Sequence, residues 1–214
     1  MISKYFVRKL LRWGPENKRR FPWRNKNASA YRILTAEIML QKTNAEKVEP
    51  TFRKFIKKYP NIKELNKAKV GEIEKMLKVL GLQKNKAQRL KLIAEEVNSK
   101  CRGKILDSRE NLMKLKGIGN YTVNALLCFK FNKHATIVDT NTARVISRFF
   151  DYKIKGRART DKQLWKFMED ITPRRKCREF NYALLDFANA ICKIKPLCKE
   201  CIFNNKCRYF SKNK

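Results

Sequence analysis

The sequence is poor in several kinds of residue, and each scarcity argues against a class of protein. Its 214 residues include only 19 Asp and Glu, against 52 Lys and Arg, so the formal net charge is +33. A single histidine, His134, argues against a His-based catalytic triad or a histidine-rich metal site. Seven Gly and six Pro are few for a loop-rich all-β chain. No apolar run approaches the ~20 residues of a membrane span.

The N-terminal segment 1–20 is basic but has no long apolar stretch, which predicts an intracellular protein (cytoplasmic or nucleoid) rather than a secreted one. Hydrophobic residues make up 43% of the chain and aromatic residues 11%, which is enough for a packed core and argues against disorder. The excess of positive charge favours a polyanionic partner, and nucleic acid is the leading candidate because phosphate binding releases counterions. A ribosomal or chromatin protein that only binds phosphates, or a basic membrane-surface protein, would have the same composition.

Helical periodicity dominates the chain and predicts an all-α protein. One expected helix starts near Pro50 and ends before Pro60, and another ends at Gly81. A further helix starts at Ser108, whose side chain can cap it. The remaining expected helices cover 30–43, 84–100, 121–131, 141–150, 162–171 and 178–192. The only β-like run is 135–138.

Four of the seven cysteines form a C-x5-C-x2-C-x5-C array near the C-terminal end: Cys192, Cys198, Cys201 and Cys207. An odd cysteine count and the expected intracellular location argue against a disulfide framework. Zinc is an alternative, but zinc sites usually pair two C-x2-C units and this array has one. A 4Fe-4S cluster held by one compact loop is favoured. We expect it to be a structural element that presents basic residues to DNA, rather than an electron carrier.

The segment 115–122 places Gly117 and Gly119 around Ile118, between two expected helices. Such a turn can direct backbone N–H groups at a phosphate, beside the N-terminus of the following helix. Taken alone, the pattern is more often an ordinary turn between helices.

Two carboxylates are unusual in so basic a chain. Asp139 follows the short apolar run and precedes a helix, where it is a good N-cap and where a carboxylate stays ionised. Glu37 lies on the apolar face of its expected helix, between Ile33 and Leu40. It is either one half of a buried ion pair or a desolvated acid that can hydrogen-bond or protonate a ligand.

Several motifs, taken in order, resemble the endonuclease III superfamily of DNA glycosylases. LKGIGNYTVNALL (115–127) followed by VDTNTARVISR (138–148) is similar to the helix–hairpin–helix and Gly/Pro-rich–Asp signature of that superfamily. FPWR (21–24), AEIMLQKT (36–43), GLQKNKAQRL (81–90) and the cysteine array are similar as well. The first cysteine gap differs, with five residues here where the superfamily usually has six.

The resemblance implies two helical domains with DNA in the cleft between them. One would be a helical barrel over 25–133, with its helix–hairpin–helix at about 108–131. The other would combine 1–24 with 134–214 and carry the cluster in the loop 192–207. The target nucleotide would be flipped out of the duplex.

The resemblance also assigns roles to residues. Asp139 matches the catalytic Asp, which stabilises positive charge on the sugar and activates water. Superfamily members that also nick DNA carry a nucleophilic Lys at the position of Tyr121, so this chain is expected to be monofunctional. Glu37 and Tyr121 would complete the catalytic site by lining the base pocket. DNA contacts are implied for the hairpin residues Lys116, Gly117, Ile118, Gly119, Tyr121 and Thr122 and for a wedge of Gln41, Lys42 and Thr43.

The favoured substrate is thymine or uracil opposite guanine in double-stranded DNA, bound by a monomer. Adenine glycosylases are the alternative branch. They usually carry a further C-terminal domain that reads oxidised guanine, and this sequence stops seven residues after Cys207. A strand-nicking endonuclease III-like enzyme and a non-catalytic DNA-binding module are the other two hypotheses.

Overall fold

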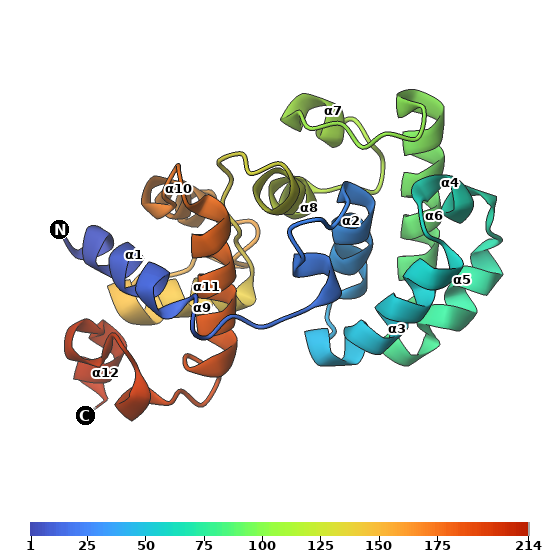
Figure 1. The fold of residues 1–214 in the computed structure, drawn as a ribbon. Helices are drawn as coiled ribbons and strands as arrows, with labels where there is room; N and C mark the ends of the chain where they lie inside the picture. Colours follow the sequence, from blue (N-terminus) through green and yellow to red (C-terminus); the bar gives the residue numbers. More distant parts are fainter. Residues whose placement is uncertain (214) are drawn as a thin grey trace. The chain divides into compact units, whose positions relative to one another are not determined.

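The structure is a computed structural model that describes residues 1–213, and helices account for all of the regular secondary structure in them (Figure 1). The all-α prediction is confirmed. The α-helices are α1 (Ile2–Trp13), α2 (Ala30–Met39), α3 (Ala45–Lys58), α4 (Ile62–Lys67), α5 (Val70–Leu77), α6 (Gln83–Cys101), α7 (Arg109–Met113), α8 (Asn120–Ala125), α9 (Thr140–Phe150), α10 (Lys162–Ile171), α11 (Cys177–Ala190) and α12 (Arg208–Lys212). Short 3₁₀ segments are η1 (Pro22–Arg24), η2 (Lys78–Leu80), η4 (Cys198–Glu200) and η5 (Asn204–Lys206), and η3 (Leu126–Lys130) is a π-helical segment.

Helix α3 begins at Ala45, five residues before the expected start near Pro50, which lies inside the helix. Val48 is buried on the same face as Phe52 and Phe55, at the i, i+4 and i+7 positions. Burying Val48 requires a helical turn before the proline, and this packing outweighs the N–H donor that Pro50 lacks.

The β-like run 135–138 is not a strand, which agrees with the all-α prediction. Its backbone instead bonds to one fully buried side chain of α11, that of Asn181. The Ile137 N–H donates to Asn181 Oδ1 over 3.1 Å, and Asn181 Nδ2 donates to the Ala135 carbonyl over 3.0 Å. The amide supplies the donor and the acceptor that a neighbouring strand would otherwise supply.

The chain forms two compact units: unit 1 comprises Met1–Arg19 and Asn132–Lys214, and unit 2 comprises Arg20–Phe131. In unit 1, helices α1, α9 and α11 enclose an aromatic core. The Phe6 ring stacks on Phe203 at 4.7 Å between centroids and lies 4.9 Å from the Phe149 ring. Phe203 precedes Cys207, so this core also anchors the cysteine-rich segment.

Unit 2 is built around α2, which contacts α3, α6, α8 and η3. Eight of the ten α2 residues are buried. The long helix α6 packs against α4 and α5. A helix that is apolar on nearly all sides is a core helix, and α2 therefore holds its one acidic residue, Glu37, inside the unit.

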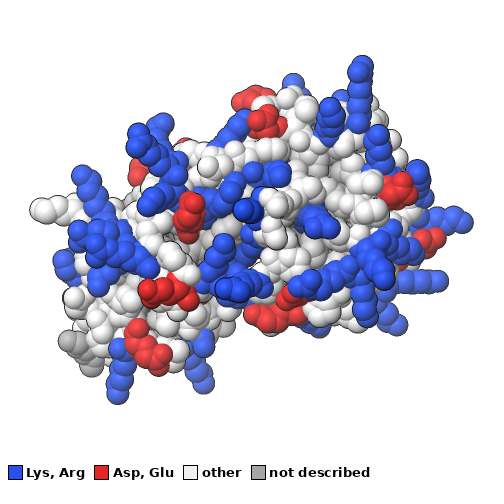
Figure 2. Space-filling model, in the orientation of Figure 1, with Lys and Arg blue, Asp and Glu red and all other residues white. Residues whose placement is uncertain are grey.

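Lys and Arg side chains are spread over the visible face of both units, with few Asp and Glu among them (Figure 2). Among the described residues, none of the helices combines the length and the apolar character needed to cross a membrane.

Candidate active site and DNA interface

Helices α7 and α8 form a helix–hairpin–helix that local hydrogen bonds hold together. The Ser108 hydroxyl accepts the Asn111 N–H over 3.2 Å and caps α7, as the sequence predicted. Arg109 in α7 donates to the side-chain oxygens of Asn120, at 2.9 Å, and of Asn124, both in α8. The two short helices are therefore linked by side-chain bonds, as well as by packing.

The hairpin turn is also fixed to α6. Gly117 has φ +83°, and a Cβ there would lie 3.1 Å from the Ile93 side chain, so the turn needs glycine for its conformation and for its close approach. Arg89 Nε donates to the Gly117 carbonyl over 2.5 Å. The Lys116 N–H donates to Glu96 over 3.2 Å. Hydrogen bonds from Lys100 and from that N–H hold the pKa of Glu96 below its usual value.

The hairpin presents backbone and one cation, rather than the full set of predicted side chains. Lys116 is exposed, and a Cβ on Gly119 would meet nothing within 4 Å, so the backbone there is open to a ligand. The side chains of Ile118 (7% exposed) and Thr122 (2%) are buried. A DNA contact by these two residues therefore has to use their backbone, and the Ile118 N–H already donates to the Leu115 carbonyl over 3.3 Å.

Glu37 and Tyr121 belong to helices that contact each other, α2 and α8 in unit 2. Glu37 is 8% exposed, which agrees with its predicted position on the apolar face. Tyr121 is half-buried in the first turn of α8. The two residues are thus placed on contacting helices of one unit, with the Glu37 side chain buried.

The segment 41–43 is fastened by a buried lysine that sequence reasoning missed. Lys86 in α6 is 2% exposed, and its Nζ donates to Thr43 Oγ1 at 2.8 Å and to the Leu80 carbonyl at 3.2 Å. Thr43 Oγ1 itself donates to the Leu80 carbonyl at 2.8 Å. Burial and the nearby Lys47 ammonium lower the pKa of Lys86.

The same contacts tie together two loops with unusual backbone. Lys42 (φ +53°) and Leu82 (φ +51°) both have left-handed conformations, and Leu82 leaves its apolar side chain 46% exposed. Such conformations in residues other than glycine are uncommon and persist only where the surroundings impose them.

Asp139 caps α9, as predicted, with both halves of a capping box. Its Oδ1 accepts the Asn141 and Thr142 N–H groups at 2.9 and 2.8 Å, and Thr142 Oγ1 accepts the Asp139 N–H at 3.0 Å. Its Oδ2 receives a longer bond, 3.4 Å, from the Asn141 side chain. The carboxylate is half-buried, and its orientation is fixed by two short bonds to Oδ1 and one longer bond to Oδ2.

Arg144 connects this cap to the start of the cysteine-rich segment. It donates to Asn141 Oδ1 at 3.0 Å, to the Cys192 carbonyl at 2.9 Å and to the Ala188 carbonyl at 3.0 Å. Burial lowers the pKa of the Arg144 guanidinium, although Asp139 nearby acts in the opposite direction. Nothing in the local sequence indicated this link, because Cys192 is far from Arg144 in the chain.

Arg148, one turn further along α9, holds the cysteine-rich segment directly. It donates to the Lys193 carbonyl at 2.5 Å and to the Ile194 carbonyl at 2.9 Å, and lies 3.6 Å from Cys192 Sγ. The Cys207 thiol in turn bonds to the Arg148 carbonyl at 3.5 Å.

The four cysteines of the array are partly buried and influence one another electrostatically. Burial raises the pKa of the Cys201 thiol to about 11, and Cys207, Cys192 and Cys198 also contribute to the rise. Among residues 1–213, no three His, Cys, Asp or Glu side chains are arranged as a ready metal-binding group. As a donor set, however, four thiols in one short segment suit a thiophilic centre. The Phe203 N–H lies 3.4 Å from Cys201 Sγ and the Arg148 guanidinium 3.6 Å from Cys192 Sγ, and such groups stabilise anionic sulfur.

One known family model matches more than half of the chain. The model described as "HhH-GPD superfamily base excision DNA repair protein" matches residues 35–170. The chain belongs to this superfamily of base excision DNA repair proteins.

Individual relatives are similar to this chain over nearly its whole length. A thymine/uracil-DNA glycosylase of Methanothermobacter thermautotrophicus is 36% identical over 98% of this chain and 95% of its own length. The solved structure of a thermostable thymine-DNA glycosylase superposes with a TM-score of 0.91 at 36% identity, covering 98% of this chain and 97% of that one. An adenine DNA glycosylase of Buchnera aphidicola is 34% identical over 96% of this chain, but the match covers 59% of its length.

Proposed function

We propose that this protein is a monofunctional DNA N-glycosylase that removes thymine or uracil mispaired with guanine. The observation that carries the proposal is the full-length similarity to glycosylases named for thymine and uracil, in sequence and in fold. The match to an adenine glycosylase leaves much of that enzyme's length uncovered, so we treat adenine as the second substrate to test.

Asp139 is the proposed catalytic carboxylate. The bond from C1′ of the sugar to the base nitrogen breaks, the base departs with the bonding electrons, and water oxygen bonds to C1′. Positive charge develops on the sugar during this step, and a fixed carboxylate stabilises it without reorganising. The cap holds Oδ1 of Asp139 with two short bonds, whereas Oδ2 receives one longer bond of 3.4 Å, so Oδ2 is the oxygen more available to the sugar or to the attacking water. The same carboxylate can accept the proton that the water loses.

Glu37 and Tyr121 are proposed to contact the base. The buried Glu37 carboxyl can hydrogen-bond to the polar edge of a pyrimidine and supply a proton to it as it leaves. The Tyr121 ring offers a face on which a base can pack. A phenol cannot form a Schiff base with the opened sugar, so strand cleavage through a covalent intermediate is not expected.

The hairpin and the segment 41–43 are proposed to bind the duplex, with DNA as the partner of a monomeric protein. Exposed Lys116 and the open backbone at Gly119 suit phosphate oxygens. Gln41, Lys42 and Thr43 would occupy the space that a flipped nucleotide leaves. The bonds from Lys86 and Thr43 to the Leu80 carbonyl would hold that segment in position.

Cys192, Cys198, Cys201 and Cys207 are proposed to hold a 4Fe-4S cluster, with zinc as the alternative. When bound, the cluster would act as a covalent staple for this segment. Arg148 and Arg144 fix the start of the segment to α9, the helix that Asp139 caps. Iron and sulfide analysis of the purified protein, together with its visible absorbance, tests the assignment. Zinc without iron would refute it.

A single-turnover excision panel tests the function. The duplexes carry T·G, U·G, A·G, A opposite 8-oxoguanine and an oxidised pyrimidine, and each is assayed with and without alkali to reveal abasic sites. We expect release from T·G and U·G, with strand breaks only after alkali. Preferential release of adenine would refute the thymine and uracil assignment and identify an adenine glycosylase instead. Borohydride trapping of a covalent adduct would contradict the role of Tyr121, and release from no duplex would revive a non-catalytic DNA-binding module.

A further inference from the structure

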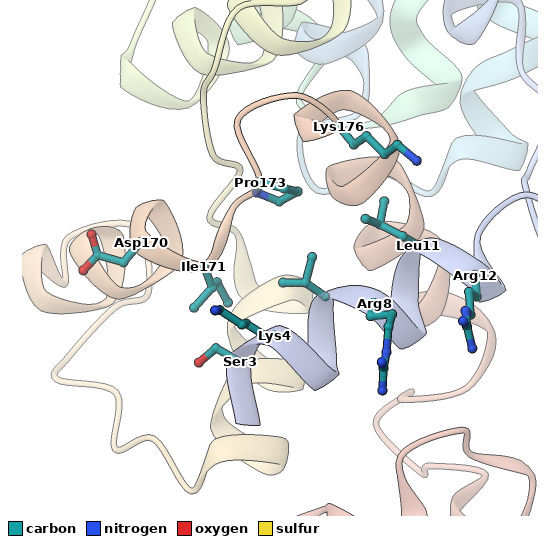
Figure 3. Close-up of a pocket in the computed structure, with 10 residues that line it drawn as sticks. Ser3, Lys4, Arg8, Leu11, Arg12, Asp170, Ile171, Pro173 and Lys176 are labelled. Atoms are coloured by element: carbon teal, nitrogen blue, oxygen red, sulfur yellow. The ribbon is translucent and has the colours of Figure 1, made fainter. Parts of the chain in front are cut away.

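Unit 1 contains a groove that none of the proposed DNA contacts uses. It lies between α1 and the turn that joins α10 to α11, with a volume of about 550 Å³ (Figure 3). Val7 and Leu11 line it from α1, and Ile171 and Pro173 line it from the turn. These side chains give the groove an apolar floor.

The edges of the groove are cationic. Lys4, Arg8 and Arg12 follow one another along α1 at intervals of four residues, and Lys176 lies on the opposite side. All four are exposed. The single acid in the lining, Asp170, is already paired with Lys166 at 2.9 Å. The groove therefore combines an apolar strip with positive charge that has no acidic counterpart in its lining.

The α1 wall of this groove is rigidly mounted. Phe6 and Leu10, on the neighbouring face of α1, are fully buried in the unit 1 core. At the end of the helix, a Cβ on Gly14 would lie 2.7 Å from the Ala183 side chain, so α1 and α11 approach closely there. A fixed wall lowers the ordering cost of binding a partner.

The spacing of the cations fits a helical partner. Residues four apart on a helix are separated by about 6 Å along its axis, so the three cations form a straight row beside the row of Val7 and Leu11. A second helix with carboxylates at every fourth position has the same spacing, and its adjacent apolar row can fill the floor. A second copy of this chain is a poor occupant, because it carries 52 Lys and Arg against 19 Asp and Glu. The phosphates of a DNA backbone would pair with the cations but would leave the apolar floor without an apolar partner.

We propose that this groove, lined by α1 and the α10–α11 turn, docks an acidic amphipathic helix from a partner protein. The apolar row of that helix packs against Val7, Leu11 and Ile171. Its carboxylates pair with Lys4, Arg8 and Arg12. The site is separate from the residues assigned to base removal, so the proposal does not depend on the proposed function.

A synthetic helical peptide of about 20 residues tests the proposal, with Glu at every fourth position and Leu on the neighbouring stripe. Its binding to the full-length protein is measured by fluorescence anisotropy at about 0.15 M salt, where purely electrostatic contacts are screened. We expect R8E/R12E to weaken binding by about tenfold or more, and Leu11→Ser to weaken it as well. A scrambled peptide of the same composition should bind about tenfold less tightly than the patterned one.

The matched control is K54E/K57E, an identical charge change on exposed lysines of α3 in unit 2. It should leave peptide affinity within about twofold of wild type, and thermal melts verify that every variant folds. Equal binding of scrambled and patterned peptides, or an equal loss in both double variants, would reduce the effect to net charge and overturn the proposal. Absence of binding by the patterned peptide would overturn it too. If R8E/R12E weakened binding of a T·G duplex more than K54E/K57E does, the groove would belong to the DNA interface instead.

Discussion

Replacing Asp139 separates its two roles, because asparagine preserves one and removes the other. In Asp139→Asn the amide oxygen can still accept the Asn141 and Thr142 N–H groups that the carboxylate accepts at 2.9 and 2.8 Å. Asn and Asp are about equally good N-caps, so the change in unfolding free energy should be a few tenths of a kcal/mol, ~0.5 at most. The negative charge, however, is lost.

The expected loss of activity is much larger than the loss of stability. Removing one fixed group that stabilises transition-state charge typically costs about 100- to 1000-fold in rate, or about 3–4 kcal/mol in activation free energy. Asp139→Ala also loses the cap, which adds a stability cost of about 1 kcal/mol. This remains small beside the roughly 5–15 kcal/mol that holds a folded protein together, so both variants should be folded at assay temperature.

Asp161 offers a matched control in the same unit. It also caps an α-helix, α10: its Oδ1 accepts the Leu164 N–H at 2.9 Å, and its Oδ2 accepts the Lys155 N–H at 2.8 Å. These bonds lower the pKa of Asp161. The resulting stabilisation is present above the unfolded pKa of 3.8 and disappears as the pH falls through the lowered folded pKa. Asp161→Asn should therefore lose acid-dependent stability and keep normal excision.

The assay is single-turnover release of thymine from a T·G duplex, with DNA affinity and thermal melting measured on the same preparations. Asp139→Asn should bind the duplex and melt like wild type while its excision rate falls by about 100-fold or more. An excision rate within about threefold of wild type would refute the catalytic role and leave Asp139 as a cap only. A comparable rate loss in Asp161→Asn would show that any weakened cap in the unit slows the reaction.

Three further predictions concern the scaffold. Gly14→Ala should lower the unfolding free energy by about 1–3 kcal/mol, because its Cβ would lie 2.7 Å from the buried Ala183 side chain. Gly71→Ala in α5, where a Cβ would meet nothing within 4 Å, should instead raise the unfolding free energy by about 0.5–1 kcal/mol. Denaturant titrations measure both changes. Burial lowers the folded pKa of Lys86 below 10.5, so the unfolded chain binds more protons than the folded one. The unfolding free energy of wild type relative to Lys86→Met should therefore rise with pH up to pH 10.5. A pH-independent difference would refute the lowered pKa of Lys86. Gly117→Ala, with φ +83° and its Cβ 3.1 Å from an α6 side chain, should weaken duplex binding about tenfold, and unchanged binding would remove the hairpin from the interface.

Sequence reasoning succeeded where the deciding contacts are local. The caps at Ser108 and Asp139 form within three residues of the capping side chain, so the residue types and their spacing were enough to predict them. Periodicity placed Glu37 on a buried face for the same reason. The motifs that carry the family resemblance are likewise contiguous segments, and the family match confirms that resemblance.

Sequence reasoning failed or was silent where the partner lies far along the chain. The run 135–138 is a loop because Asn181, more than forty residues later, supplies its hydrogen bonds. Pro50 lies inside a helix because the turn before it buries Val48 in the core. Lys86 is buried because its Nζ can donate hydrogen bonds to Thr43 Oγ1 and to the Leu80 carbonyl. These contacts depend on which elements meet in three dimensions.

The sequence by itself thus determined the class of fold, the superfamily and the two unusual carboxylates, since charge, periodicity and capping act over a few residues. Only the tertiary structure decided how those groups are held: the hairpin fixed to α6 by Arg89 and Glu96, and the α9 cap linked to the cysteine-rich segment by Arg144. It alone revealed the groove beside α1, because a groove is a relation between side chains of distant segments. Burial and hydrogen bonding at long range are cooperative properties of the packed chain, and no local pattern encodes them.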